Sequence, residues 1–306
     1  MPQSEKISNL IKQKALQLGF SACGIAKAEY LQKEENHIHD WLQKGYHAKM
    51  NYMANNRKKR VDPRELVEGA KSVIVVLLNY YPQKVQKDDV PKVAKYAYGK
   101  DYHFVVKEKL KELLKFINVE IQSVNGRVFC DSAPILEHAW ASKAGLGWIG
   151  KNTQLINKDI GSFVFIGELI IDLELEYDES LPEHCGTCTK CIDSCPTEAI
   201  KLPYQINANK CISYLTIELR DDIPLRFKGQ MNNNVFGCDI CQDVCPWNKK
   251  AKPNQMEELQ PNTKFHTLDY KAWQNMTLDT YKEIFKGTPV DRIGYKRLLG
   301  NIEFLK

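Results

Sequence analysis

Eight of the ten cysteines of this chain lie between residues 185 and 245, in two runs that each end before a proline. The first run comprises Cys185, Cys188, Cys191 and Cys195. The second comprises Cys211, Cys238, Cys241 and Cys245. The first run has the C-x₂-C-x₂-C-x₃-C-P spacing with which bacterial proteins hold 4Fe-4S clusters. Two runs with the same ending predict two such clusters, and therefore a protein that moves electrons.

The spacing also predicts which cysteines share a cluster. Two-residue gaps let three thiolates of one loop reach one cluster, whereas the cysteine before the proline ligates the other cluster. We therefore expect one cluster on Cys185, Cys188, Cys191 and Cys245. We expect the other on Cys195, Cys211, Cys238 and Cys241. This assignment uses every cysteine of the two runs once.

Disulfide bonding, zinc ligation and simple core packing each account for these cysteines less well. Disulfide frameworks are typical of short secreted chains, whereas this chain is long and shows no signal peptide. Zinc usually takes two separated pairs of ligands, and a C-x₂-C-x₂-C triplet crowds a tetrahedral ion. Cysteines that only fill a core would not be spaced so regularly. Cys23 and Cys130 lack such a motif, and we interpret both as small buried apolar residues.

A glycine-rich segment precedes the cysteines. Residues 144–152 read A-G-L-G-W-I-G-K-N, which suits neither a helix nor a strand. The segment is not a P-loop, since Asn152 follows Lys151, and it lacks the dinucleotide fingerprint. Glycines let a backbone approach a large ligand closely. A structural turn and a ligand-binding loop both remain open.

Two further segments carry groups that can move protons. Asp131 opens D-S-A-P between an expected strand and an expected helix, where it is either an N-cap residue or an acid in a cleft. Tyr96, Tyr98 and His103 lie together in K-Y-A-Y-G-K-D-Y-H. A lone histidine is more often structural than catalytic, and both roles remain open for His103.

Length and patterning predict an α+β protein of 306 residues with about two domains. We expect helices over 5–18, 31–44, 101–117 and 134–144. We expect strands over 22–26, 72–79, 119–124, 127–130 and 163–172. An acidic, proline-containing connector near residues 178–183 divides a domain over 1–178 from a cysteine domain over 179–250. Residues 251–306 form a polar and helical extension that packs on the core.

Charge and hydropathy exclude a membrane-spanning protein and permit a polyanionic partner. The net charge is +5, and short basic runs lie at 57–60 and 249–250. These runs either contact a polyanion or are simply solvated loops. No stretch of about 18 apolar residues exists, and neither an apolar leader nor a twin arginine is present. We therefore expect a cytoplasmic protein, and no seam suggests anything but a monomer.

Several segments together closely resemble the epoxyqueuosine reductase family. They are Y-A-Y-G-K-D-Y-H at 96–103, D-S-A-P-I-L-E at 131–137, A-G-L-G-W-I-G-K-N-T at 144–153, H-C-G-T-C-T-K-C at 184–191, C-I-S-Y-L-T-I-E at 211–218 and C-D-I-C-Q-D-V-C-P-W-N at 238–248. The resemblance implies a nitroreductase-like domain that binds cobalamin, followed by a ferredoxin-like domain with two 4Fe-4S clusters. It implies reduction of epoxyqueuosine at the tRNA wobble position to queuosine, the last step of queuosine biosynthesis.

The resemblance also assigns roles to residues. Asp131 matches the family's proton donor, a role that a pKa raised by weak solvation would suit. Tyr96, Tyr98 and His103 would support the active site. The cobalamin contacts implied are Arg57, Gly147, Trp148, Lys151, Asn152, Gln154 and Ser213. Trp247, Lys249 and Lys250 are expected to contact the tRNA anticodon stem-loop, by stacking and phosphate contacts. An unidentified reductant would supply electrons.

One departure and three competing functions accompany this resemblance. Longer family members continue into C-terminal helical repeats that help to grip tRNA, and these are largely absent here. A respiratory reductive dehalogenase shares cobalamin and two clusters but usually carries a twin-arginine signal. An electron carrier would not need some 180 residues before its clusters. A nucleic-acid-binding module with structural clusters would not take up a corrin.

Overall fold

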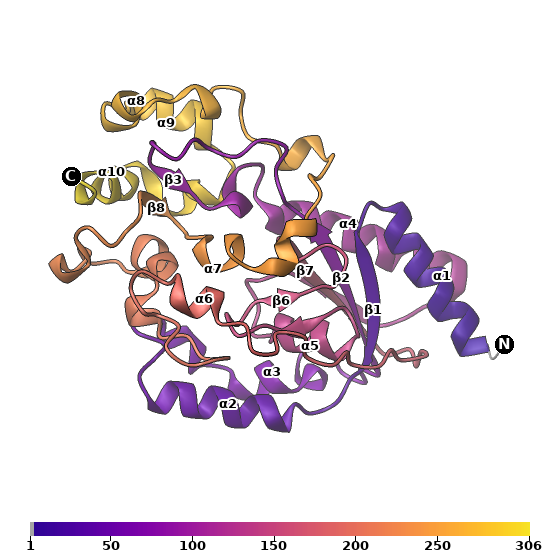
Figure 1. The fold of residues 1–306 in the computed structure, drawn as a ribbon. Coiled ribbons are helices and arrows are strands. Elements are labelled where there is room, and N and C mark those ends of the chain that lie inside the picture. Colours follow the sequence, from indigo (N-terminus) through magenta and orange to yellow (C-terminus); the bar gives the residue numbers. More distant parts are fainter. Residues whose placement is uncertain (1–2) are drawn as a thin grey trace.

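The computed structural model describes residues 3–306 and centres on one four-stranded antiparallel sheet (Figure 1). The strands are β1 (Ala22–Lys27), β2 (Ser72–Asn79), β4 (Gly126–Phe129) and β7 (Val164–Ile171). Their order is β1-β2-β7-β4, with β2 and β7 paired over their full length. This arrangement of mixed helices and antiparallel strands confirms the α+β prediction.

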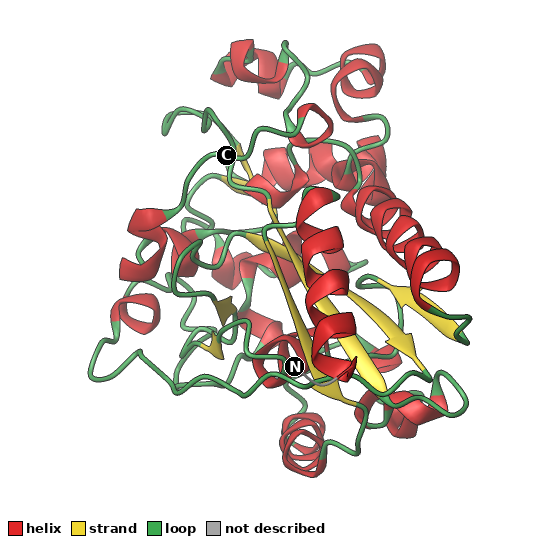
Figure 2. Cartoon of the chain, turned by 90° about the vertical axis from the view of Figure 1, so that its right-hand side faces the viewer, coloured by secondary structure: helices red, strands yellow, loops and turns green. Residues whose placement is uncertain are grey.

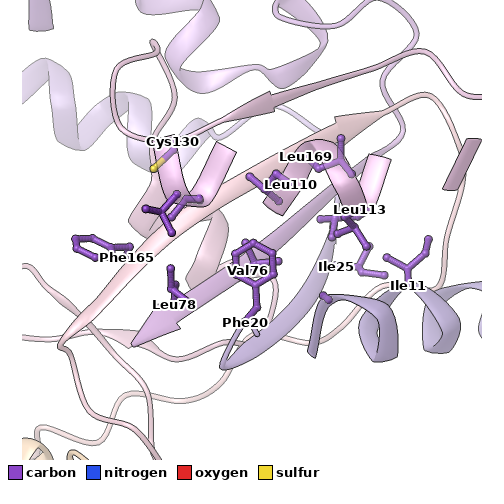
Figure 3. Close-up of a cluster of buried hydrophobic side chains, with 14 of the residues drawn as sticks. Ile11, Phe20, Ile25, Val76, Leu78, Leu110, Leu113, Cys130, Phe165 and Leu169 are labelled. Atoms are coloured by element: carbon purple, nitrogen blue, oxygen red, sulfur yellow. The ribbon is translucent and has the colours of Figure 1, made fainter. Parts of the chain in front are cut away.

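Apolar residues on both faces of β2 explain why helices cover the sheet on two sides. Ile74, Val76 and Leu78 point into a core with α1 (Gln3–Gln17) and α4 (Tyr102–Phe116). Figure 2 shows these two long helices lying over one face of the sheet. In Figure 3, Ile11 of α1 and Leu110 and Leu113 of α4 reach toward the strands.

The opposite face of the sheet supports the functional site. The alternate residues of β2, Val73, Val75 and Leu77, pack with Trp140 of α5 (Glu137–Lys143). Further helices on this part of the chain are α2 (Gln32–Gln43) and α3 (Arg57–Val61), which lie near α5 (Figure 1). A small antiparallel pair, β5 (Trp148–Ile149) and β6 (Leu155–Ile156), follows α5.

The cysteine-rich segment is joined to both ends of the chain. Its helices α6 (Lys190–Asp193) and α7 (Ile240–Asp243) lie side by side. Strand β8 (Asn234–Phe236) pairs in parallel with β3 (Lys92–Val93). Phe236 and Val93 then share a core with α8 (Tyr270–Gln274), α9 (Leu278–Phe285) and α10 (Gly294–Phe304). Buried contacts therefore cross both domain boundaries expected from the sequence.

Short helical turns connect these elements. Single turns lie at Asn51–Met53, Pro63–Glu65, Lys95–Ala97, Ala208–Lys210, Leu225–Phe227, Pro246–Lys250, Glu257–Leu259, Phe265–Thr267 and Pro289–Ile293. Wider π turns lie at Ile117–Ile121 and Tyr214–Glu218. Among residues 3–306, no helix is both long and apolar enough to cross a bilayer.

Two expected elements are wrong. Residues 119–124 are not a strand, because α4 continues into the π turn and Asn118 accepts a hydrogen bond from the Val124 amide (2.9 Å). The helix expected from residue 134 begins only at Glu137. Before it, the Ser132, Ala133 and Ile135 amides each donate to the carbonyl two residues back. These tight turns compete with a helical start.

Candidate functional site

A large cavity lies beside the turn that carries Asp131. Its volume is ≈ 1450 Å³, above the roughly 300–1,000 Å³ of a drug-sized ligand site. Its wall includes Trp41 of α2, Arg60 of α3, residues 131–139, Trp148 and Arg292. The chain thus provides room for a ligand well above the usual size.

The backbone presents Asp131 to this cavity in a restricted conformation. Asp131 follows β4 and has a φ of +55°, which is uncommon for a residue with a Cβ. Its carboxylate accepts hydrogen bonds from the Tyr102 hydroxyl (2.5 Å) and from Nε2 of His103 (3.0 Å). Strained backbone conformations of this kind are concentrated at functional sites.

His103 connects Asp131 to a second carboxylate. Asp101 caps the N-terminus of α4 by accepting from the His103 amide, and its Oδ1 lies 2.6 Å from Nδ1 of His103. Burial lowers the pKa of His103, but the hydrogen bonds to Asp101 and Asp131 outweigh this effect and raise it to about 9. His103 is therefore protonated at neutral pH and donates to both carboxylates.

The raised pKa that would suit Asp131 to proton donation is not found in this structure. Burial does raise it, but hydrogen bonds from His103 and Tyr102 and the charges of His103 and Arg292 lower it below its usual range. Asp131 is therefore ionised here, and its side chain keeps 46% of its surface exposed. The nearby proton is held by His103.

The structure separates the two tyrosines that the sequence placed with His103. Tyr96 is half-buried, with its ring centroid 6.1 Å from that of Tyr102, the partner of Asp131. Tyr98 packs against Phe265 in the C-terminal core (4.7 Å between centroids) and accepts from the Gln86 amide. Tyr96 thus supports the Asp131 network, whereas Tyr98 does not line the cavity.

The glycine-rich segment links the cavity wall to the cysteine loops. A Cβ on Gly147 would lie 2.3 Å from the Ile156 carbonyl oxygen, so this glycine permits close backbone packing. Trp148 lines the cavity. Lys151 donates to the carbonyls of Gly186 and Cys188, the latter at 3.0 Å, and Asn152 donates to the Cys241 carbonyl (3.3 Å).

The remaining expected corrin contacts lie off the cavity wall. Arg57 lies 3.8 Å from Glu35 in an ion pair, and Gln154 pairs through its backbone with Gly150. Ser213 approaches the Cys211 thiol and lowers its pKa against the larger effect of burial, which raises it. Of the seven, only Trp148 is among the residues that line the cavity.

Four cysteines of the first predicted set surround a smaller pocket of ≈ 250 Å³. They are Cys185, Cys188, Cys191 and Cys245. Lys151, Asn152 and Trp247 are among the other residues that line it. Burial raises the pKa of the Cys191 thiol, and nearby Cys185, Cys245 and Cys188 raise it further.

The other four cysteines are also neighbours. Burial raises the pKa of the Cys238 thiol, with Cys211 and Cys195 adding to the effect. Burial also raises the pKa of Cys241, with Cys238 and Cys211 as its main thiol neighbours and Cys191 as a weaker one. The two sets thus adjoin through Cys241 and Cys191. Within residues 3–306 no three His, Cys, Asp or Glu side chains converge as ligands of a single metal ion.

The expected tRNA contacts lie beside the first set. Trp247 packs edge-on against Trp148 at 4.9 Å between centroids. The Lys250 ammonium lies 5.9 Å from the Trp247 ring centroid, and Lys249 is exposed next to it. Trp247 is thus held by the cysteine pocket rather than standing free.

Sequence reasoning missed five residues of this site. Asp101 and Tyr102 stood in a quoted motif without a role, and the register of the first turn of α4 could have indicated them. Arg292 comes from the C-terminal extension and carries no local signal. Glu137 and Glu168 are buried carboxyl groups near Asp131. Glu168 stands alone in the apolar run F-I-G-E-L-I-I, which is an unusual place for a charge.

Family models and similar sequences all point to the same family of proteins. The family model "4Fe-4S double cluster binding domain" matches residues 184–248, and "Epoxyqueuosine reductase QueG, DUF1730" matches residues 60–132. The epoxyqueuosine reductase of Cellulophaga algicola is 51% identical, with 100% of both chains covered. That of Escherichia coli is 39% identical, covering 97% of this chain and 80% of its own.

Solved structures agree with these sequences. An epoxyqueuosine reductase with a tRNA-Tyr epoxyqueuosine-modified stem loop matches at a TM-score of 0.88 and 28% identity, over 98% of this chain and 80% of that one. A Bacillus subtilis epoxyqueuosine reductase whose catalytic aspartate loop is swung out of the active site matches at 0.87 and 28%, over 98% and 81%. A reductive dehalogenase linked to B12-dependent dehalogenation matches at 0.51 and 16%, over 84% and 33%, which shows a related fold alone.

Proposed function

The chain belongs to the epoxyqueuosine reductase family, and from this premise we propose that it reduces epoxyqueuosine at the wobble position of tRNA to queuosine. The reaction uses cobalamin and two 4Fe-4S clusters, and is the last step of queuosine biosynthesis. The observation that carries the proposal is the position of Asp131, on the wall of a ≈ 1450 Å³ cavity beside two sets of four cysteines.

The residues present fit both kinds of cofactor. All ten cysteines are free thiols, and eight of them form the two neighbouring sets that the ligand assignment requires. The large cavity suits a corrin, which supplies the reducing chemistry at its cobalt when bound. Trp148 forms part of that cavity wall, and Lys151 and Asn152 hold the cysteine loops against it.

Asp131 is the group that delivers a proton to the departing epoxide oxygen. Its counterpart is the catalytic aspartate of the Bacillus subtilis enzyme, whose loop swings. Because Asp131 is ionised while His103 holds a proton 3.0 Å away, His103 reloads Asp131 for each turnover. Asp101 keeps the imidazole oriented through its other nitrogen. A general acid of this kind typically accelerates a reaction ~10²- to 10⁴-fold.

Finer features of the fold and of tRNA binding belong to the same proposal. The sheet with α1, α4 and α5 is a nitroreductase-like scaffold, and residues 184–248 are ferredoxin-like. The anticodon loop presents its wobble base to the cavity, where Arg292 and Arg60 supply positive charge. Trp247, Lys249 and Lys250 contact the flanking nucleotides.

Turnover of a defined RNA tests this function. The anaerobically reconstituted enzyme is mixed with a stem-loop that carries epoxyqueuosine, a chemical reductant and cobalamin, and the nucleosides are analysed by mass spectrometry. We expect queuosine to form, and omission of cobalamin to abolish it. A preparation with full iron and bound corrin that leaves epoxyqueuosine intact would refute the proposal.

A further inference from the structure

Glu168 is a fully buried carboxyl group in the middle of a central strand. It lies in β7 opposite Phe129 of β4 and Val75 of β2, both of which belong to the core around Trp140. Its exposed fraction is 0%, and within residues 3–306 neither carboxylate oxygen has a hydrogen-bond donor. An ionised carboxylate without a partner is very costly in such surroundings, so this group needs a proton or a charged partner.

Glu137 is the neighbouring carboxyl group that can accept a hydrogen bond from a protonated Glu168. It opens α5, and its Oε1 accepts a hydrogen bond from the backbone amide of Asp131. Burial raises the pKa of Glu137, with the charge of Asp131 adding to the effect. Burial also raises the pKa of Glu168, with Glu137 and Asp131 as further causes. Glu168 shares the sheet face that packs against α5, and Glu137 opens that helix, so the two carboxyl groups lie close together.

We propose that Glu168 and Glu137 share one proton and, as a pair, hold the Asp131 turn in the conformation that faces the cavity. Two ionised carboxylates can only accept hydrogen bonds, whereas a protonated Glu168 can donate to Glu137. Glu137 would then accept from Glu168 on one side and from the Asp131 amide on the other. Glu168 does not line the cavity, and Glu137, which does, binds the backbone of Asp131 rather than its carboxylate, so both are positioning residues.

Tyr102 and His103 hold the side chain of Asp131, but the backbone of the turn has few other contacts and needs such an anchor. Asp131 is in the left-handed region, and the bonds that follow it span only two residues each. The Lys107 ammonium donates to the Ser132 hydroxyl (3.0 Å), which is an exposed contact. In the Bacillus subtilis structure the catalytic aspartate loop is swung out of the active site. In this protein the acid pair would hold the base of the Asp131 turn in place.

The surroundings of the pair define how it responds to pH. From α4, His103 and Lys107 supply positive charge; from the turn, Asp131 supplies negative charge. The residues opposite Glu168 on β2 and β4, Val75 and Phe129, are apolar. Loss of the shared proton as the pH rises would therefore set two poorly solvated carboxylates against each other and release the Asp131 turn.

Hydrogen exchange of the holoenzyme tests the pair without any substrate. Exchange of residues 130–137, corrected for the intrinsic effect of pH, is followed from acidic to strongly alkaline pH. In the wild type we expect protection at low pH and a loss of protection as the shared proton leaves. Glu168→Gln should stay protected throughout, because its amide donates to Glu137 at every pH. Glu168→Leu should be unprotected throughout.

Two further measurements separate positioning from folding. The infrared carbonyl stretch of a protonated carboxylic acid should be present in the wild type and absent in Glu168→Gln. Glu168→Leu should lower kcat about 10²-fold, the typical effect of small misplacements, with KM changed little, while Glu168→Gln keeps near-normal kcat. Strand β2 is the internal reference, and its protection should be equal in all three proteins.

The idea fails if Glu168→Gln keeps the wild-type pH profile of exchange, or if Glu168→Leu leaves residues 130–137 fully protected. It rests on the proposed function only through the role of Asp131. Because exchange and infrared spectra need no turnover, a wrong substrate would leave both results standing.

Discussion

Replacement of Asp131 by asparagine isolates the proton-transfer step from binding. Asparagine keeps the size of the side chain, and its carbonyl oxygen can still accept from Tyr102. It cannot hold a proton, and its amide group then faces Nε2 of His103 donor to donor. One of the two carboxylates that raise the pKa of His103 is lost as well. A single substitution thus removes the acid and lowers the pKa of His103, the group that supplies its proton.

The expected magnitude follows from these two losses. General-acid catalysis typically contributes ~10²- to 10⁴-fold. Since the acid and its reloading group are affected together, we expect kcat to fall by the upper part of that range, ~10³- to 10⁴-fold. This corresponds to roughly 4–5 kcal/mol of transition-state stabilisation at 1.36 kcal/mol per tenfold. The affinity for the stem-loop should change only a few-fold, because phosphate contacts dominate binding.

Single-turnover kinetics on the epoxyqueuosine stem-loop provide the assay. Iron content and corrin absorbance are measured on each preparation, so that loss of cofactor is not mistaken for loss of catalysis. Asp279→Asn, an exposed aspartate in the first turn of α9, is the matched control and should behave as wild type. Asp131→Asn with single-turnover rates within a few-fold of the control would show that Asp131 donates no proton in the rate-limiting step.

Three further predictions concern the network, the clusters and the fold. In the wild type, the raised pKa of His103 stabilises the fold fully below about pH 6.5, and this stabilisation is lost as the pH rises through about 9. His103→Gln should remove this pH dependence of the free energy of unfolding. Urea unfolding at several pH values would show the difference. Cys241→Ser should reduce iron from about eight to about four atoms per chain by elemental analysis, and an unchanged content would exclude it as a ligand. Lys95→Met should lower the free energy of unfolding by about 3–5 kcal/mol, because it leaves the buried Asp239 carboxylate without its ion-pair partner at 3.4 Å. Denaturant titration measures this change, and a loss below about 1 kcal/mol would contradict the prediction.

Local signals predicted much of the fold. Strand β2 has the bounds expected from its apolar run, Ser72–Asn79, because β-branched residues buried on both faces leave little choice of structure. The pattern around residues 119–124 misled, since its apolar residues continue α4 in a π turn. Helix α5 begins late for a different reason: backbone bonds that span only two residues hold residues 130–135 in tight, non-helical turns.

The candidate site was only partly predictable. Cysteine spacing restricts which thiols can share a cluster, and the structure places Cys185, Cys188, Cys191 and Cys245 around one pocket; the assignment of ligands to two clusters stays a prediction. Arg292 could not be foreseen, because it reaches the cavity through the packing of the C-terminal segment. The lowered pKa of Asp131 could not be foreseen either. It depends on hydrogen bonds from Tyr102 and His103, and no sequence pattern gives the geometry of those side chains.

The shared wall between the cavity and the cysteine loops implies an order of maturation. Trp148 packs on Trp247 and His184, while Lys151 and Asn152 are tethered to backbone carbonyls of the cysteine loops. Ligation of their thiolates would fix those loops in place, so we expect iron insertion to come before corrin uptake. A cell starved of iron would therefore accumulate polypeptide that vitamin supplementation alone does not rescue.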